Sequence, residues 1–311
     1  MELIRPSVEI WEQGTTLEDM WKHIARCTRV CYQSTPKENG ETDEEFIKRV
    51  ILRNITNEDL DWNKIHGAML EHGTVYLELY RNDDMESFWY THYLNNKYSK
   101  VIHSQETDCF YITTNLRVIS ENNWYDSLKY VCTPTKYHAK RVTVSFITNI
   151  GVSREFNRHR VNSIAEESTR YCNYNKRNDG QIKIGLPAWL LDEENLPYVE
   201  SHQFDKLDSY CEDVLGNESL IDNWCDIDYY LFSLTVAEFC YNALIQKGWK
   251  PQQAREVLPL ATKTQLIHTA FIDDWKHFFA LRADGVSGPS HPNAKLIAAP
   301  LKEEFIKRNL L

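Results

Sequence analysis

Apolar residues recur every three to four positions over residues 17–31, which is the spacing of an amphipathic helix. Thr15 and Glu18 stand three residues apart just before this stripe, as in a capping box that satisfies free backbone N–H groups at a helix start. Thr42 and Glu45 repeat the pattern ahead of a second apolar stripe. The N-terminal part of the chain is therefore predicted to form two capped helices.

Farther along the chain, segments of alternating apolar and polar residues are interleaved with segments of helical spacing. Strands are predicted at residues 74–80, 141–148, 181–186 and 262–271. Helices are predicted at residues 85–97, 154–160, 227–247, 251–259, 272–283 and 292–307, with a short helix ending at 72. This pattern predicts one elaborated domain that contains both kinds of structure.

The composition is that of a soluble globular protein, with 311 residues of which 42% are hydrophobic and 26% charged. The net charge of −10 argues against a protein whose main task is to grip a nucleic-acid backbone, because such proteins present a basic face. No apolar run is long enough to cross a bilayer, and the start, MELIRPSVEIW, lacks the features of a signal peptide. We therefore expect a cytoplasmic protein without membrane contact and without an obligatory nucleic acid.

Common cofactor motifs are missing from the sequence. The eight cysteines include no Cys-x-x-Cys pair, which favours reduced, mostly buried thiols over a zinc ribbon. His66, His72 and His159 lack the spacing that places two imidazoles on one helical face, so no metal is expected. The 11 glycines form no G-x-G, which excludes a dinucleotide-binding fingerprint of the usual kind.

The densest chemistry lies in residues 154–171, REFNRHRVNSIAEESTRY. Its arginines offer planar donor forks suited to phosphate and to the edge of a uracil or ribose, while its glutamates and serine supply partners for hydroxyl and ring N–H groups. This composition predicts a nucleotide site. The alternative is a solvated helix face whose charged residues pair four positions apart, for example Glu155 with His159.

The order of these residues resembles the signature of the flavin-dependent thymidylate synthases. Arg158-His159-Arg160 is followed by seven residues, then Ser168, and the chain continues to Arg170-Tyr171. Three further segments resemble this family at its spacing: HGAMLEH at 66–72, AREVLPL at 254–260 and FFALR at 278–282.

This resemblance implies an α+β fold, with residues 1–311 forming a single domain whose central, mostly antiparallel sheet is flanked by helices. Residues from about 81 to 140 fall outside the similar segments and are expected to be an insertion. The resemblance also implies a homotetramer with sites at subunit junctions.

The resemblance implies a role for particular positions of this sequence. Arg282 is expected to be catalytic, by polarising the pyrimidine. The residues expected to bind dUMP are Glu155, Arg158, Glu166, Glu167, Ser168, Thr169, Arg170 and Arg255. The residues expected to bind FAD are His66, Ala68, Arg158, His159, Arg160, Glu166, Phe271, Asp273 and His277.

Several positions depart from the family pattern. Ala165 stands where an Asn is common, Glu155 stands where some members have Gln, and Phe271 replaces a frequent Asn. The usual Ala-Gln-x-Glu after the last arginine is replaced by SHPNAKLIAAPL. These departures predict a divergent member, in which the flavin contacts differ more than the nucleotide contacts.

The activity implied by the resemblance is reductive methylation of dUMP to dTMP, with FAD as cofactor and NADPH and 5,10-methylenetetrahydrofolate as co-substrates. One alternative is another flavin- and folate-dependent modification of a pyrimidine nucleotide, such as hydroxymethylation. Another is non-catalytic binding of a nucleotide or nucleic acid. Ser168 is interpreted as a hydrogen-bonding residue because no G-x-S-x-G elbow surrounds it, and Cys172 as a buried thiol and not a nucleophile.

Overall fold

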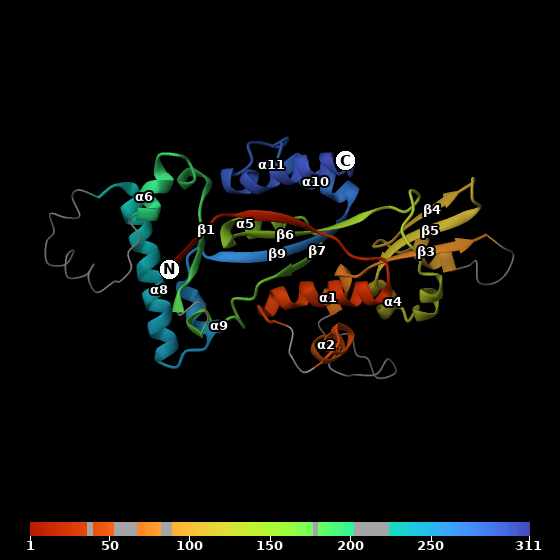
Figure 1. The fold of residues 1–311 in the computed structure, drawn as a ribbon, viewed down its shortest axis with the longest axis horizontal. Helices are drawn as coiled ribbons and strands as arrows, with labels where there is room; N and C mark the ends of the chain where they lie inside the picture. Colours follow the sequence, from red (N-terminus) through yellow and green to blue (C-terminus); the bar gives the residue numbers. More distant parts are fainter. Residues whose placement is uncertain (36–39, 53–66, 82–88, 177–179, 202–223) are drawn as a thin grey trace.

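The computed structural model describes residues 1–35, 40–52, 67–81, 89–176, 180–201 and 224–311. Its centre is a four-stranded, fully antiparallel sheet with the strand order β2-β6-β9-β7 (Figure 1). These strands are β2 (Ser7–Trp11), β6 (Arg141–Asn149), β7 (Ser163–Glu166) and β9 (Lys263–Phe271). The predicted strands at 141–148 and 262–271 are confirmed as the two inner strands.

Three helices, α5 (Ile150–Phe156), α10 (Ile272–Arg282) and α11 (Pro292–Lys307), pack against the central sheet around an aromatic core. Phe146 of β6 packs against Phe156 and Phe278, and its ring centroid is 5.0 Å and 5.9 Å from theirs. Because side chains of a strand alternate between faces, every second residue of β6 and β9 joins this core. Figure 1 shows α10 and α11 together on this face of the sheet.

The opposite face of the sheet is covered by α1 (Leu17–Tyr32), which in turn packs on α2 (Asp43–Val50). Thr16 caps α1: its hydroxyl accepts the Asp19 N–H at 3.1 Å, and the Asp19 carboxylate accepts the Thr16 N–H at 3.2 Å. The predicted capping box at Thr15 was therefore one residue early, because both threonines are followed three positions later by an acidic residue. The second predicted box, Thr42 with Glu45, is confirmed.

A second antiparallel sheet, of three strands in the order β3-β5-β4, forms one end of the molecule. Together with the short helices next to its strands, this sheet accounts for most of the described residues between 67 and 131. Its elements are η3 (Gly67–His72), β3 (Thr74–Tyr80), α3 (Trp89–Leu94), β4 (Lys100–Ser104), β5 (Cys109–Asn115), α4 (Leu116–Glu121) and η5 (Tyr125–Tyr130). The helix expected over 85–97 ends at Leu94, and its first residues lie outside the described residues. That this segment is an insertion stays a prediction.

The other end of the molecule is mainly helical (Figure 1). It contains the short parallel pair β1 (Glu2–Ile4) and β8 (Lys183–Gly185). Its helices are η6 (Tyr174–Lys176), η8 (Ala188–Leu190), α6 (Asn195–Ser201), α8 (Asp226–Gln246), α9 (Pro251–Ala254) and η10 (Arg255–Val257). Among the described residues, none of the helices combines the length and apolar character needed to cross a lipid bilayer. The predicted α+β class with antiparallel sheets and flanking helices is confirmed.

Candidate active site

The Arg-His-Arg stretch lies in a turn between α5 and β7. Because α5 ends at Phe156, the helix predicted over residues 154–160 is wrong at its C-terminal end. Asn157 ends the helix, as its short amide side chain donates to Glu166 Oε2 at 2.8 Å and favours a helix terminus over a helix interior. The turn that follows carries the three residues of the motif in alternating directions.

His159 is the residue of this stretch that points inward. Its side chain is 5% exposed, its ring centroid lies 4.9 Å from that of Phe278, and Arg282 donates its Nε–H to His159 Nε2 at 3.2 Å. Burial lowers the pKa of His159 to about 4, aided by the charge of Arg282, so the ring is neutral and able to accept at neutral pH. Arg158 and Arg160 are exposed to solvent.

Arg282, in the last turn of α10, is held on two sides. Its Nη1 lies 2.8 Å from Glu155 Oε2, and its Nη2 donates to the main-chain oxygen of Glu155 at 2.7 Å. With the bond from Nε to His159, the guanidinium is fixed in orientation by groups on α5 and on the turn after it.

A pocket of about 560 Å³ lies at the end of β7, and we name it the Ser168 pocket. It is lined by Ile150, Arg154, Glu166, Glu167, Ser168, Thr169, Arg255, Glu256, Leu258, Pro259 and Leu260. These residues come from two segments that the sheet brings together, namely the one that runs from α5 through β7 and the one that runs from η10 toward β9. The pocket thus has two cations, three carboxylates and two hydroxyl groups on its walls.

Two adjacent carboxylates on the wall of the Ser168 pocket are held by different partners. Glu166 accepts from Asn157 and, at 3.0 Å, from Thr264 Oγ1. Glu167 Oε2 lies 2.7 Å from Lys263 Nζ, and both side chains are largely buried, with 4% and 11% exposure respectively. The local negative charge of Glu167 is therefore compensated by Lys263.

The hydroxyl groups of the Ser168 pocket are held in place by the backbone and by an arginine. The Ser168 N–H donates to the main-chain oxygen of Cys31 at 3.0 Å, which attaches this loop to the end of α1. Arg255 donates from Nη1 to Thr169 Oγ1 at 3.4 Å. Arg170 is exposed and donates to Gln252 Oε1 at 3.1 Å.

A second pocket, of about 570 Å³, lies where the central sheet meets the three-stranded sheet, and we name it the Phe271 pocket. Its walls include Arg160, Phe271 and Arg141 from the central part of the fold, and Lys100 from β4. The Lys100 ammonium lies 4.7 Å from the centroid of the Phe271 ring and 2.7 Å from Asp273 Oδ2. The hydrogen bond from Lys100 lowers the pKa of Asp273, so Asp273 is ionised at neutral pH.

Residues 137–306 match the family described as thymidylate synthase complementing protein, or Thy1. This stretch comprises more than half of the chain and contains the whole Ser168 pocket. The chain belongs to this family.

Solved structures also match the Thy1-family chain along most of its length. A UMP/dUMP methylase, PolB from Streptomyces cacaoi, matches with 5-Br dUMP bound (16% identity, TM-score 0.41, covering 99% of this chain and 93% of that chain) and with 5-Br UMP bound (17%, 0.41, 98% and 91%). Thymidylate Synthase X (ThyX) from Helicobacter pylori, with FAD and dUMP, matches at 14% identity and a TM-score of 0.37, covering 96% of this chain and 92% of that chain. None of the curated proteins matches.

The structure divides the predicted site residues of this Thy1-family chain among several places. Five of the residues expected to bind dUMP line the Ser168 pocket: Glu166, Glu167, Ser168, Thr169 and Arg255. Glu155, His159 and Arg282 form a separate contact cluster, and Arg158 and Arg170 line neither pocket.

Of the residues expected to bind FAD, Arg160 and Phe271 line the Phe271 pocket and Asp273 lies beside it. His277 and Ala68 are exposed and line neither pocket, and His66 lies outside the described residues.

Sequence reasoning missed several polar residues at these two pockets. Lys263 supports the Ser168 pocket through Glu167, while Arg141 and Lys100 belong to the Phe271 pocket. Two of these three carried a visible signal, because Arg141 and Lys263 are charged residues at the starts of strands that contain no other Lys, Arg, Asp or Glu. A charged residue at such a position either faces solvent or serves a site.

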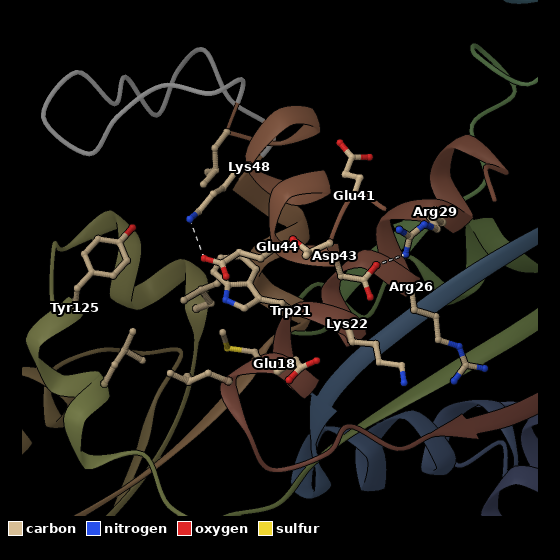
Figure 2. Close-up of a pocket in the computed structure, with 16 residues that line it drawn as sticks. Glu18, Trp21, Lys22, Arg26, Arg29, Glu41, Asp43, Glu44, Lys48 and Tyr125 are labelled. Carbon is tan, nitrogen blue, oxygen red and sulfur yellow. Dashed lines mark ion pairs between the residues drawn. The ribbon is translucent and has the colours of Figure 1, made fainter. Parts of the chain in front are cut away.

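A larger pocket than either of these lies elsewhere, between α1, α2 and the region of α4 and η5 (Figure 2). Its volume is about 1170 Å³, and no residue expected to bind dUMP or FAD lines it. Its charged groups pair with one another: Arg29 with Asp43 and Lys48 with Glu44, both at 2.8 Å. The volume of a pocket therefore does not by itself identify the candidate active site of this chain.

The remaining alternatives concern thiols and metals. Cys172 is fully buried, as predicted for a structural thiol, and its Sγ lies 4.0 Å from the main-chain oxygen of Cys31. In the part of the chain that the structure describes, no cysteine forms a disulfide, and no group of three His, Cys, Asp or Glu side chains is arranged to hold a metal ion.

Proposed function

We propose that this chain catalyses the reductive methylation of dUMP to dTMP, with FAD as cofactor, NADPH as reductant and 5,10-methylenetetrahydrofolate as one-carbon donor. The observation that carries the proposal is the Ser168 pocket, because it joins the end of the Arg-His-Arg-x(7)-Ser motif to Arg255 from a segment of the chain more than eighty residues away. Membership of the Thy1 family supports the same activity.

The Ser168 pocket suits a nucleoside monophosphate. Arg154 and Arg255 are the cations available to a phosphate dianion, since neither of them takes part in a buried ion pair with the described residues. Ser168, Thr169 and Glu166 offer donors and acceptors for ribose hydroxyl groups and for the ring N–H of uracil. We assign dUMP to this pocket.

The role of Arg282 follows from the chemistry of uracil. Carbon 5 is a poor nucleophile until negative charge builds up on the ring, and a fixed cation near the ring carbonyls stabilises this charge where it develops. Glu155 and His159 hold Arg282 in one orientation, and Glu155 is the sequence neighbour of Arg154 in the pocket wall. Arg282 is therefore the residue that we propose to polarise the pyrimidine.

The hydrogen-bond donors on the walls of the Phe271 pocket suit a flavin dinucleotide. Arg160 is exposed at its wall, and Phe271 gives it an aromatic surface. When bound, FAD would supply the redox chemistry, with NADPH as the source of the electrons needed to reduce the transferred carbon to a methyl group. We also propose a homotetramer, in which residues of neighbouring subunits complete the sites.

The first experiment is the visible spectrum of the purified protein, followed by tritium release from 5-tritiated dUMP with NADPH and methylenetetrahydrofolate. A flavin spectrum together with folate-dependent release, and dTMP identified by mass spectrometry, would support the proposal. A product that retains an additional oxygen would instead indicate hydroxymethylation. A colourless protein that added FAD does not rescue would exclude the flavin-dependent reaction and favour simple nucleotide binding.

A further inference from the structure

The Phe271 pocket has a wall that the family resemblance does not account for. Lys97 and Lys100 belong to the three-stranded part of the chain, which precedes the residues that match the Thy1 family. They line the same cavity of about 570 Å³ as Arg160 and Phe271, and the Lys100 ammonium lies 4.7 Å from the centroid of the Phe271 ring. A segment expected to be an insertion thus builds half of a pocket whose other half carries residues expected to bind FAD.

Arg141 is a largely buried cation in this pocket that forms no ion pair with the described residues, although the nearby carboxylates of Glu71 and Asp274 act to raise its pKa. Its Nη1 donates to the main-chain oxygen of Glu71 and to Thr74 Oγ1, and its Nη2 donates to Ser163 Oγ, each at 3.1 Å. Its Nε is buried and has no hydrogen-bond partner among the described residues. Burial lowers the pKa of Arg141 to about 10, so it is still charged at neutral pH. A largely buried charge whose hydrogen bonds all go to neutral groups is costly, and an anion would offset that cost.

Lys97 and Arg160 add further positive charge around Arg141. Both are exposed, and neither forms an ion pair with any described residue. Arg117 adds no net charge to the pocket, because it is already paired with Glu71 and Glu121. The available cations are therefore the largely buried Arg141 and the exposed Lys97 and Arg160, and they outnumber the remaining carboxylate of the pocket, Asp274.

Apolar surface lies next to these cations. Tyr98 is 51% exposed and Val161 is 63% exposed, and both line the pocket together with the Phe271 ring. Inorganic phosphate would use only the cations. A ligand that carries phosphate groups between two ring systems would use the cations and the apolar walls at the same time.

We propose that the Phe271 pocket binds the diphosphate of a dinucleotide, with Arg141 as its buried anchor and Lys97 of the three-stranded segment as a second phosphate contact. This proposal rests on the proposed function insofar as it names FAD or NADPH as the dinucleotide. It goes beyond that function because it gives residues 97–100 a role in ligand binding that no similar segment implies.

The test compares Lys97→Ala with Lys136→Ala. Lys136 is an exposed lysine of the same part of the chain that does not line the pocket and contacts Glu106 at 3.7 Å. Dissociation constants are measured by flavin fluorescence for FAD and riboflavin, and by calorimetry for NADPH, ADP and dUMP. For Lys97→Ala we expect affinity for the dinucleotide to fall roughly fivefold, with riboflavin and dUMP unchanged. Lys136→Ala should bind all five like the unmodified protein.

Arg141→Met tests the buried anchor, and we expect it to lower the dinucleotide affinity more than tenfold. If Arg141→Met does not fold, the comparison at Lys97 decides alone, because that side chain is exposed. A loss for FAD assigns the diphosphate to the flavin, and a loss for NADPH alone assigns it to the nicotinamide nucleotide. If Lys97→Ala binds FAD, NADPH and ADP each as tightly as Lys136→Ala does, the proposed diphosphate site is wrong. ADP binding that depends on Lys97 in a protein without methylation activity would keep the site and reject the proposed function.

Discussion

Arg282 contacts Glu155 twice, with Nη1 2.8 Å from the side-chain Oε2 and Nη2 2.7 Å from the main-chain oxygen. The two residues are 127 positions apart, and their contact joins the last turn of α10 to α5. The neutral ring of His159 accepts the remaining Nε–H. A guanidinium held by three bonds loses little further freedom when a substrate binds, which is the condition for effective electrostatic stabilisation.

Arg282→Ala should retain FAD but lose turnover by about 100- to 1,000-fold, because the cation that stabilises charge on the uracil is removed. Arg282→Lys should restore only a small part of the lost turnover, since an ammonium cannot make the paired contact with Glu155. Flavin absorbance and tritium release measure the two effects. Arg308→Ala serves as the control, as Arg308 is a partly exposed arginine paired with Glu304 and Glu12. Normal turnover in Arg282→Ala would refute the catalytic assignment.

The Glu167–Lys263 pair should contribute strongly to stability, because removing one partner leaves a buried charge unpaired. We expect Glu167→Gln and Lys263→Met each to lower the free energy of unfolding by about 3–5 kcal/mol, and the double variant to lower it by less than the sum. Urea unfolding measures these changes. The matched control is Lys302→Met, because Lys302 contacts Asp284 at the same 2.7 Å but with 33% and 41% exposure, and should cost about 1 kcal/mol or less.

Arg255→Ala should weaken dUMP binding about tenfold while leaving FAD affinity unchanged, since a charged hydrogen bond to the phosphate is lost. The salt dependence of dUMP binding should also become shallower. Calorimetry at two ionic strengths measures both effects, with Arg5→Ala as an exposed control. If both variants bind dUMP equally, the phosphate does not lie in the Ser168 pocket.

Acid should destabilise the protein through its buried histidines. Burial lowers the pKa of His23 and of His159 to about 4, and that of His268 to about 3. Each is neutral in the fold and takes up a proton on unfolding below its ordinary pKa of 6.5, so the stabilisation is complete above pH 6.5 and is lost as the pH falls toward 4. Each histidine should contribute a slope of about 1.4 kcal/mol per pH unit in this window.

Urea midpoints between pH 7 and pH 4 measure this loss. His268→Gln should reduce the slope by the share of one histidine. His277→Gln should not reduce it, because His277 is exposed. An equal slope in both variants would contradict the assignment.

The elements that sequence patterns predicted best are those whose signal is local. The strand at 141–148 and the final helix at 292–307 were placed within a residue of their ends, because apolar periodicity and a proline in the first helical turn act over a few residues. Errors arose where two local signals competed. Thr15 and Thr16 both fit a capping box, and Asn157 ended a helix that the arginines after it were expected to continue.

The sequence by itself determined that charged and polar groups are concentrated between Arg158 and Ser168, since those groups are close along the chain and remain close in any fold. Only the tertiary structure decided that Lys263 neutralises Glu167 and that Lys97 lines the same pocket as Arg160. The first contact depends on the pairing of β7 with β9, and the second on the packing of one sheet against another. Hydrophobic periodicity tells which face of a strand is buried, but it does not specify which strand lies beside it, and so it cannot bring distant charges together.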